Sequence, residues 1–234
     1  MTNYAFFDVD QTIYAGYSTP DFYLFLVTKG FGGEWTIKKD IEIGELYQSG
    51  KINYSEAGVR VVQLLADVIK DKTITEITKL ANEFVELKGL KGFVPELFAF
   101  LKLHDYQVVL VSASPDPNVE AISKISQADS FYSSKFEIVH GRFTGKVVHQ
   151  LDNEEKKDLI LRNIENDNQG HILAFGDSTG DIPMLSIAGD AFIIDPHQPE
   201  MKDIIKSHKN WYLVNEKNIL DQVTQIVMGK LSNE

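Results

Sequence analysis

The chain has 234 residues, a net charge of −11 and no cysteine. Its length suits one large domain or a domain with an insertion, and the lack of cysteine excludes disulfides, a cysteine nucleophile and thiolate metal ligands. An acidic chain without a Lys/Arg-rich stripe is a poor candidate for binding nucleic acid. The apolar runs are too short to span a bilayer and no basic segment precedes the first of them, so we expect a soluble, cytoplasmic protein without membrane contacts.

The first predicted elements are one strand and a long helical segment. YAFFDV, residues 4–9, is a short apolar run of the kind found in buried parallel strands. Residues 16–87 instead carry apolar side chains at helical spacing, interrupted by Gly30 and Gly50. This segment predicts several helices and no strand.

Helices and strands alternate in the rest of the chain. Helical patterns cover residues 94–106, 117–126, 154–166 and 181–188. Strand patterns cover 106–114, 136–148 as a hairpin, 171–178, 190–195 and 210–214. Such alternation predicts an α/β fold with a doubly wound, mostly parallel sheet.

Three of the predicted strands are followed by polar clusters, which are Asp8 with Asp10, Ser112 with Ser114, and Asp177 with Asp181. In open parallel sheets, ligands bind beyond the carboxyl ends of the strands. These residues are therefore expected to share one site. Alternate residues of an extended segment face the same way, so the first two aspartates can both point into it.

The four aspartates predict a metal site. Carboxylate oxygens with room for water suit Mg²⁺, and a cation offsets the repulsion between neighbouring carboxylates. Mg²⁺ with acids is also well suited to phosphate chemistry. Asp8 would attack phosphorus to form an aspartyl-phosphate, and Asp10 would protonate the leaving alcohol and then accept a proton from water.

Phosphate binding is expected at the second cluster. Ser112, with the backbone N–H groups of Ala113 and Ser114, would bind phosphoryl oxygens at a strand-to-helix turn. A lysine should complete the charge balance. Lys156 and Lys157 open the helix before the third strand and are the candidates.

DVDQT, VSAS, a lysine and GDSTGD, in that order, resemble the haloacid dehalogenase superfamily. SGKINYSEAGVRVV and RFTGKVV resemble segments of its phosphoserine-phosphatase-like branch. The resemblance implies a Rossmann-like core formed by residues 1–15 and 88–234. It also implies that residues 16–87 form a small helical cap.

The resemblance assigns a role to each motif position. It implies that Asp8 is nucleophile and Mg²⁺ ligand, and that Asp10 is acid/base and binds the metal through its backbone carbonyl. Asp177 would be the third protein ligand, Asp181 would support the metal's waters, and Thr12 would brace the loop. Lys157 fits the branch better than its neighbour as the phosphate-binding lysine.

Several positions depart from phosphoserine phosphatases. Gln11 stands where Gly or Ser is commoner, and Gly180 where Asn is usual. Tyr17 replaces the glutamate that meets the serine amine, and Arg60 lies one residue from the position of the serine-binding arginine. Tyr17 and Arg60 are thus candidate specificity residues, and phosphoserine is disfavoured as the substrate.

An aromatic cluster opens the helical segment: Tyr14, Tyr17, Phe22, Tyr23 and Phe25. These rings either pack within the cap or form a pocket for an apolar or cationic leaving group. None of the six histidines, His197 included, is expected to act at the site.

The function predicted is a Mg²⁺-dependent phosphatase acting on a small phosphorylated metabolite. One alternative is a phosphotransferase that uses an acceptor other than water. A second is a regulatory module that accepts a phosphoryl group on an aspartate and holds it, and a third is a catalytically silent binding protein.

Overall fold

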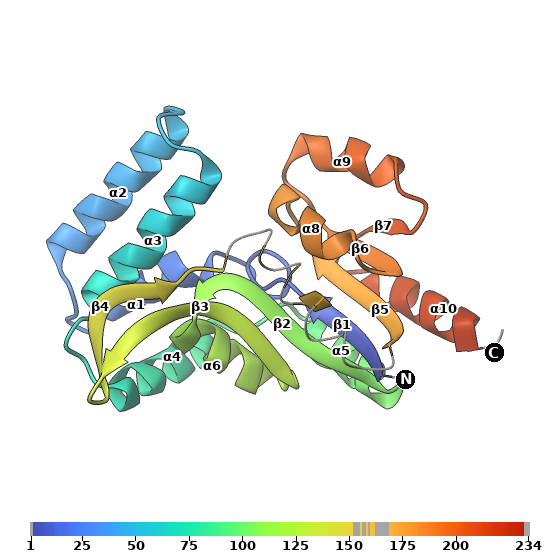
Figure 1. The fold of residues 1–234 in the computed structure, drawn as a ribbon, viewed down its shortest axis with the longest axis horizontal. Helices are drawn as coiled ribbons and strands as arrows, with labels where there is room; N and C mark the ends of the chain where they lie inside the picture. Colours follow the sequence, from blue (N-terminus) through green and yellow to red (C-terminus); the bar gives the residue numbers. More distant parts are fainter. Residues whose placement is uncertain (1, 152–154, 156–157, 159, 162–168, 232–234) are drawn as a thin grey trace.

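A computed structural model of the protein describes residues 2–151, 155, 158, 160–161 and 169–231. Within these residues the strands form one seven-stranded sheet in the order β4-β3-β2-β1-β5-β6-β7 (Figure 1). The strands are β1 (Thr2–Phe7), β2 (Tyr106–Pro115), β3 (Ser130–Val139), β4 (Arg142–His149), β5 (Gln169–Gly176), β6 (Asp190–Ile194) and β7 (Trp211–Val214). All neighbours pair in parallel except β3 and β4.

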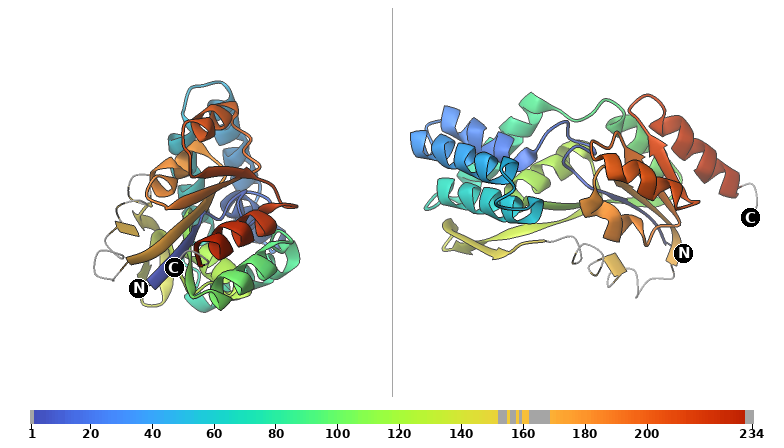
Figure 2. Two further views of the ribbon diagram at one scale, coloured as in Figure 1. Left: turned by 90° about the vertical axis from the view of Figure 1, so that its right-hand side faces the viewer. Right: turned by 90° about the horizontal axis from the view of Figure 1, so that it is seen from above.

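The described helices are α1 (Ser18–Thr28), α2 (Glu34–Gln48), α3 (Tyr54–Val68), α4 (Ile74–Lys88), α5 (Val94–Leu103), α6 (Asp116–Ser126), α8 (Ile182–Leu185), α9 (Pro199–Lys206) and α10 (Ile219–Leu231). A 3₁₀ turn, Thr179–Asp181, precedes α8. The first four helices lie together at the end of the sheet that holds the β3–β4 hairpin (Figure 2). No helix in the described part of the chain is long and apolar enough to cross a membrane.

The predicted fold class is confirmed. The predicted hairpin is β3–β4, with its turn at His140 and Gly141, both at positive φ. Residues 16–87 contain helices and no strand. Most of the predicted helix at 154–166 lies outside the described residues, and α9 and α10 were not predicted.

A row of aromatic rings beneath the carboxyl edge of the sheet fixes the strand ends. Phe7 of β1 is in register with Phe175 of β5, and their rings stack at 4.0 Å. Phe175 stacks in turn on Phe192 of β6 at 4.9 Å. All three are fully buried, and burying rings of this size contributes strongly to the core. Asp8 follows Phe7 directly, and Asp177 follows Phe175 after Gly176.

The helical segment is attached to the edge of the sheet by backbone hydrogen bonds. The connection between α3 and α4 runs beside β4, where the Asp71 N–H donates to the Phe143 carbonyl at 2.8 Å. The Phe143 N–H donates to the Lys72 carbonyl at 3.0 Å, and the Ile74 N–H to the Gly141 carbonyl at 3.0 Å. These bonds satisfy part of the otherwise open edge of β4.

Candidate active site

Three aspartates converge at the carboxyl edge of the sheet. Asp8, Asp177 and Asp181 are all buried, and each offers a carboxylate oxygen within 4.8 Å of those of the other two. The N–H of Asp8 donates to the Phe175 carbonyl at 2.9 Å, which continues the β1–β5 pairing into the site. Three buried negative charges so close together are costly without a cation. Their oxygen-only donor set fits Mg²⁺.

The loop after β5 holds Asp181 against the backbone. Asp181 Oδ2 accepts hydrogen bonds from the N–H of Asp177 at 3.2 Å and from the N–H of Ser178 at 3.1 Å. The side chain packs on Gly176, where an added Cβ would lie 2.6 Å from the Cβ of Asp181. The carboxylate therefore reaches this position because residue 176 has no side chain.

Asp10 lies in the same pocket but its carboxylate has different partners. Oδ1 accepts the backbone N–H of Ser18 at 2.9 Å, and Oδ2 accepts the Ser114 hydroxyl at 2.9 Å. The carboxylate is not one of the three clustered above. The alternation expected of an extended chain does not apply here, because β1 ends at Phe7. The ligand atom expected of Asp10 is its backbone carbonyl, and that assignment stays a prediction.

The loop that carries Asp10 is braced from two directions. Thr12 donates its hydroxyl to Asp177 Oδ1 at 3.3 Å, which matches the bracing role expected of it. Lys91, a buried lysine that sequence reasoning missed, donates its ammonium to the Gln11 carbonyl at 2.6 Å and its N–H to the Ile13 carbonyl at 2.9 Å. Gln11 has φ of 62°, a left-handed conformation in which Gly costs less.

The predicted phosphate-binding turn lies where β2 leads into α6. Ser112 and Ala113 line the pocket with the aspartates. The Ser114 N–H, expected to meet a phosphoryl oxygen, donates to Ser112 Oγ at 3.1 Å instead. The Ser114 hydroxyl accepts from the hydroxyls of Ser18 and Thr19, each at 2.9 Å, while donating to Asp10. Ser114 thus ties the start of α1 to the site.

The predicted lysine lies outside the described residues, as does its neighbour Lys156. Arg60 does not line the pocket; it is exposed on α3. His197 and Gln198, from the loop after β6, do line it; the expectation that no histidine acts at the site stays a prediction. Gln198 accepts the Thr179 N–H at 2.7 Å. Neither residue belongs to a periodic pattern or a motif that the sequence could have revealed.

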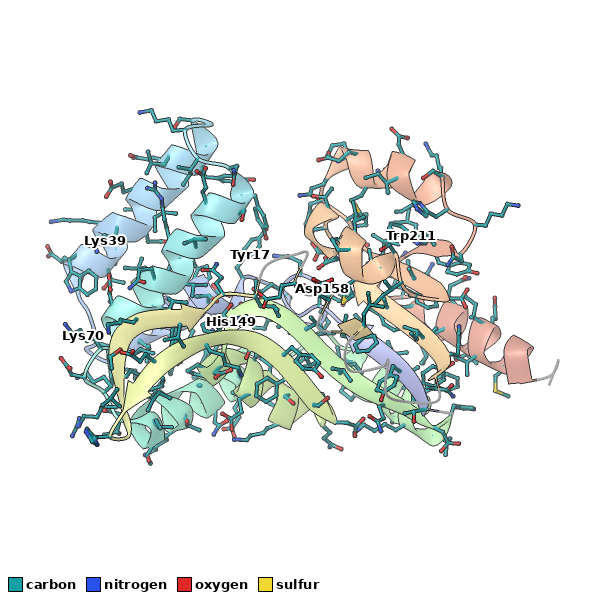
Figure 3. The ribbon with its side chains drawn as sticks, viewed as in Figure 1. Tyr17, Lys39, Lys70, His149, Asp158 and Trp211 are labelled. Carbon is teal, nitrogen blue, oxygen red and sulfur yellow. The ribbon has the colours of Figure 1, made fainter. Side chains whose placement is uncertain are left out.

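The aromatic cluster divides between the core and the pocket. Tyr14, Phe22 and Tyr23 are buried, as the packing interpretation requires. Tyr17 is 48% exposed and lines the pocket together with Tyr54, which is 51% exposed. Figure 3 shows Tyr17 between the α2–α3 pair and the α8–α9 side of the molecule.

The surroundings of the two pocket tyrosines raise the pKa of both phenols. Partial burial raises the pKa of Tyr17, and the charges of Asp177 and Asp10 raise it further. The pKa of Tyr54 is raised by burial first and then by Tyr17, Asp8 and Asp10. The two rings and their O–H groups line a pocket of about 110 Å³ that also contains the four aspartates.

Comparison with known proteins identifies the family. The model of the haloacid dehalogenase-like hydrolases matches residues 5–186. The chain belongs to this family. The matched region includes the three clustered aspartates, Asp10 and the turn at Ser112. The family and the enzyme class predicted from the motifs, a phosphatase of haloacid dehalogenase type, are confirmed.

Relatives by sequence cover most of the chain. A phosphoserine phosphatase of Methanocaldococcus jannaschii is 28% identical over 203 residues, which span 85% of this chain and 89% of the relative. A probable phosphatase of Mycobacterium tuberculosis is 25% identical over 204 residues, spanning 85% and 71%. The chain is thus phosphoserine-phosphatase-like in sequence.

Solved structures share the fold at lower identity. A protein of unknown function from Bordetella pertussis superposes with a TM-score of 0.76 at 16% identity, covering 92% of this chain and 99% of that one. A phosphoserine phosphatase determined as a phospho-aspartyl intermediate analogue superposes with a TM-score of 0.67 at 18% identity, covering 96% and 98%.

Proposed function

We propose that this protein is a Mg²⁺-dependent phosphomonoester phosphatase that works through an aspartyl-phosphate on Asp8. The observation that carries the proposal is the buried group of Asp8, Asp177 and Asp181, whose oxygens lie within 4.8 Å of one another beside Asp10. Bound there, Mg²⁺ would reduce the repulsion between the phosphate and the carboxylates and stabilise charge on the transferring group.

Asp8 and Asp10 divide the chemistry between them. A carboxylate oxygen of Asp8 forms a bond to phosphorus while the bond from phosphorus to the ester oxygen breaks. Asp10 donates a proton to the departing oxygen, so an alcohol leaves. Asp10 then accepts a proton from the water that attacks the aspartyl-phosphate, which restores Asp8 and releases inorganic phosphate.

The hydrogen bonds of Asp10 suit an acid/base role. The Ser18 N–H and the Ser114 hydroxyl fix one carboxylate oxygen each, and a proton-transfer group acts well only when its position is fixed. Ser112 and the N–H of Ala113 are the proposed phosphate ligands of the described chain, since both residues line the pocket. The lysine proposed to join them is Lys157.

The helical segment is the proposed cap. Tyr17 and Tyr54, at the starts of α1 and α3, line the pocket from this segment, while the aspartates line it from the sheet. A cover of this kind excludes water from the reaction and contacts the leaving group. We propose residues 16–87 as the cap and 1–15 with 88–234 as the core.

Phosphate release from a panel of phosphomonoesters, with Mg²⁺ or with a chelator, tests the proposal. Wild type should release phosphate only with Mg²⁺, and Asp8→Asn should abolish release. The matched control is Asp203→Asn, which changes an exposed aspartate paired with Lys206 on α9. If phosphate stays trapped on Asp8 instead of being released, the protein is a phosphoryl acceptor and the proposal is wrong.

A further inference from the structure

Two half-exposed tyrosines line the pocket, and a third contacts one of them. Tyr17 precedes α1, Tyr47 lies at the end of α2 and Tyr54 begins α3. Their exposed fractions are 48%, 47% and 51%. The rings of Tyr47 and Tyr54 meet edge-on at 6.3 Å, and Tyr54 lines the pocket together with Tyr17. We call these three residues the tyrosine cluster.

The three rings of the tyrosine cluster are exposed, so they contribute less to core packing than the buried rings of the same helices. Phe22 and Tyr23 of α1, in the same helical segment, are fully buried in the core. Large aromatic side chains grouped at a surface commonly mark a binding site. Two of the three line the pocket that contains Asp8, so a leaving group bound in that pocket would contact them.

The charges around the pocket restrict what that leaving group can be. Of the described residues that line the pocket, four are aspartates and none is lysine or arginine. A bound Mg²⁺ would offset two of the carboxylate charges, and Asp10 carries a proton when it acts as the acid, so the described lining keeps a net negative charge. A carboxylate on the leaving group would meet no lysine or arginine among the described lining residues, and Arg60 is exposed on α3 and does not line the pocket.

The geometry points to an amino alcohol without a carboxylate as the leaving group, its ammonium held by the tyrosine cluster. This inference rests on the proposed function. The negative faces of aromatic rings attract ammonium groups, and the surrounding aspartates favour a positive charge over any other. The phenol O–H groups add acceptors for a primary ammonium. Phosphoserine differs from such a substrate by one carboxylate and should be poor.

Matched substrates separate the contributions of the carboxylate, the positive charge and the ammonium hydrogens to substrate preference. Phosphoethanolamine and phosphoserine differ only by the carboxylate, phosphocholine replaces the ammonium hydrogens by methyl groups, and glycerol 3-phosphate has an uncharged leaving group. With wild type and Mg²⁺, kcat/KM should be at least roughly tenfold higher for phosphoethanolamine or phosphocholine than for phosphoserine, with glycerol 3-phosphate between them. Equal values, or a preference for phosphoserine, would overturn the inference.

Variants test whether the rings are responsible. Tyr17→Leu and Tyr54→Leu should each lower kcat/KM for phosphocholine about three- to tenfold and lower that for glycerol 3-phosphate less, because its leaving group carries no positive charge. Tyr17→Phe and Tyr54→Phe keep the rings and should keep the preference for phosphocholine. Trp35→Leu is the control, because Trp35 is a 40% exposed aromatic of α2 that does not line the pocket. Circular dichroism checks that each variant folds.

Binding measured without turnover separates this inference from the proposed function. Calorimetry on Asp8→Asn with Mg²⁺ should show phosphocholine and phosphoethanolamine binding more tightly than phosphoserine. If this order holds but wild type hydrolyses none of the esters, the substrate class stands and the proposed reaction fails. If wild type hydrolyses esters but neither assay shows the order, the inference fails and the proposed function stands.

Discussion

The hydroxyl of Ser114 donates a 2.9 Å hydrogen bond to Oδ2 of Asp10 while it accepts from Ser18 and Thr19. One hydroxyl has a single proton and two lone pairs, so all of its hydrogen-bonding capacity is used. Ser114 therefore joins the end of β2, the loop after β1 and the first turn of α1. Asp10, the proposed acid/base, and α1 of the proposed cap are therefore hydrogen-bonded to the same side chain.

Ser114→Ala should lower kcat about tenfold, because Asp10 loses one of its two fixed partners and a hydrogen bond of this kind contributes about 1–1.5 kcal/mol. KM should change little, since Ser112 and Ala113 remain. Steady-state kinetics with Mg²⁺ measures both. The control is Ser126→Ala, which removes a hydroxyl that donates to the Ser123 carbonyl within α6. An unchanged kcat in the folded Ser114 variant would show that the Ser18 N–H holds Asp10 by itself.

Asp177→Asn should alter how unfolding depends on metal. Without Mg²⁺ the variant should unfold a few degrees higher than wild type, because one of three mutually repelling buried charges is removed, a gain of about 1 kcal/mol. Saturating Mg²⁺ should stabilise wild type by about 2.7 kcal/mol at a hundredfold excess over Kd and the variant far less. Calorimetric melting with and without Mg²⁺ measures this. Equal Mg²⁺-induced shifts in the two proteins would contradict the metal assignment.

Gly176→Ala should disturb the site without changing any carboxylate. The new methyl group would lie 2.6 Å from the Cβ and 2.8 Å from the Cγ of Asp181, so that side chain must move, at a cost of about 1–3 kcal/mol. The Mg²⁺-induced rise in melting temperature should shrink as well. Gly44→Ala in α2 is the control, since nothing lies within 4 Å of its added Cβ, and it should be neutral or stabilising by up to about 1 kcal/mol. If Gly176→Ala and Gly44→Ala had the same stability and the same Mg²⁺-induced rise in melting temperature, the close contact at Gly176 would not matter for the site.

Lys91→Met should reduce both stability and turnover. It removes the ammonium that donates to the Gln11 carbonyl and leaves that acceptor without this donor, at a cost of about 1–3 kcal/mol. Because the same loop carries Asp10, kcat should fall more than KM rises. Urea denaturation and steady-state kinetics measure the two effects. The control is Lys88→Met, at an exposed position in the last turn of α4, which should change the free energy of unfolding by less than about 0.5 kcal/mol. A loss of stability as large as that of Lys91→Met would contradict the role given to the Lys91 hydrogen bond.

The strands and the place where their ends meet could be predicted because their signals are local. Apolar runs ending at Phe7, Val111 and Phe175 identify buried strands, and parallel pairing then brings Asp8, Ser112 and Asp177 to one edge. Both steps need only short stretches of sequence and one rule of sheet architecture.

Other parts of the site depend on packing between distant segments. Tyr54 reaches the pocket only because α3 packs beside α1, and His197 only because the loop after β6 folds back to the turn at Thr179. Lys91 resembles any other lysine of a polar loop until its contact with the Gln11 carbonyl is seen. No periodicity or motif marks such residues, because what selects them is three-dimensional proximity.

The attachment of the helices to β4 determines which segments can be replaced by those of another protein. Besides the backbone bonds at Phe143 and Gly141, Gln63 of α3 donates to the Gly145 carbonyl at 2.9 Å, and Arg142 donates to the Asp71 carbonyl at 2.7 Å. A graft of another protein's helices at 16–87 would strip this hairpin of its partners. Engineering of substrate specificity in this chain should therefore transplant the helices and the β3–β4 hairpin together. The two segments are separate in the sequence but are bonded to each other in the fold.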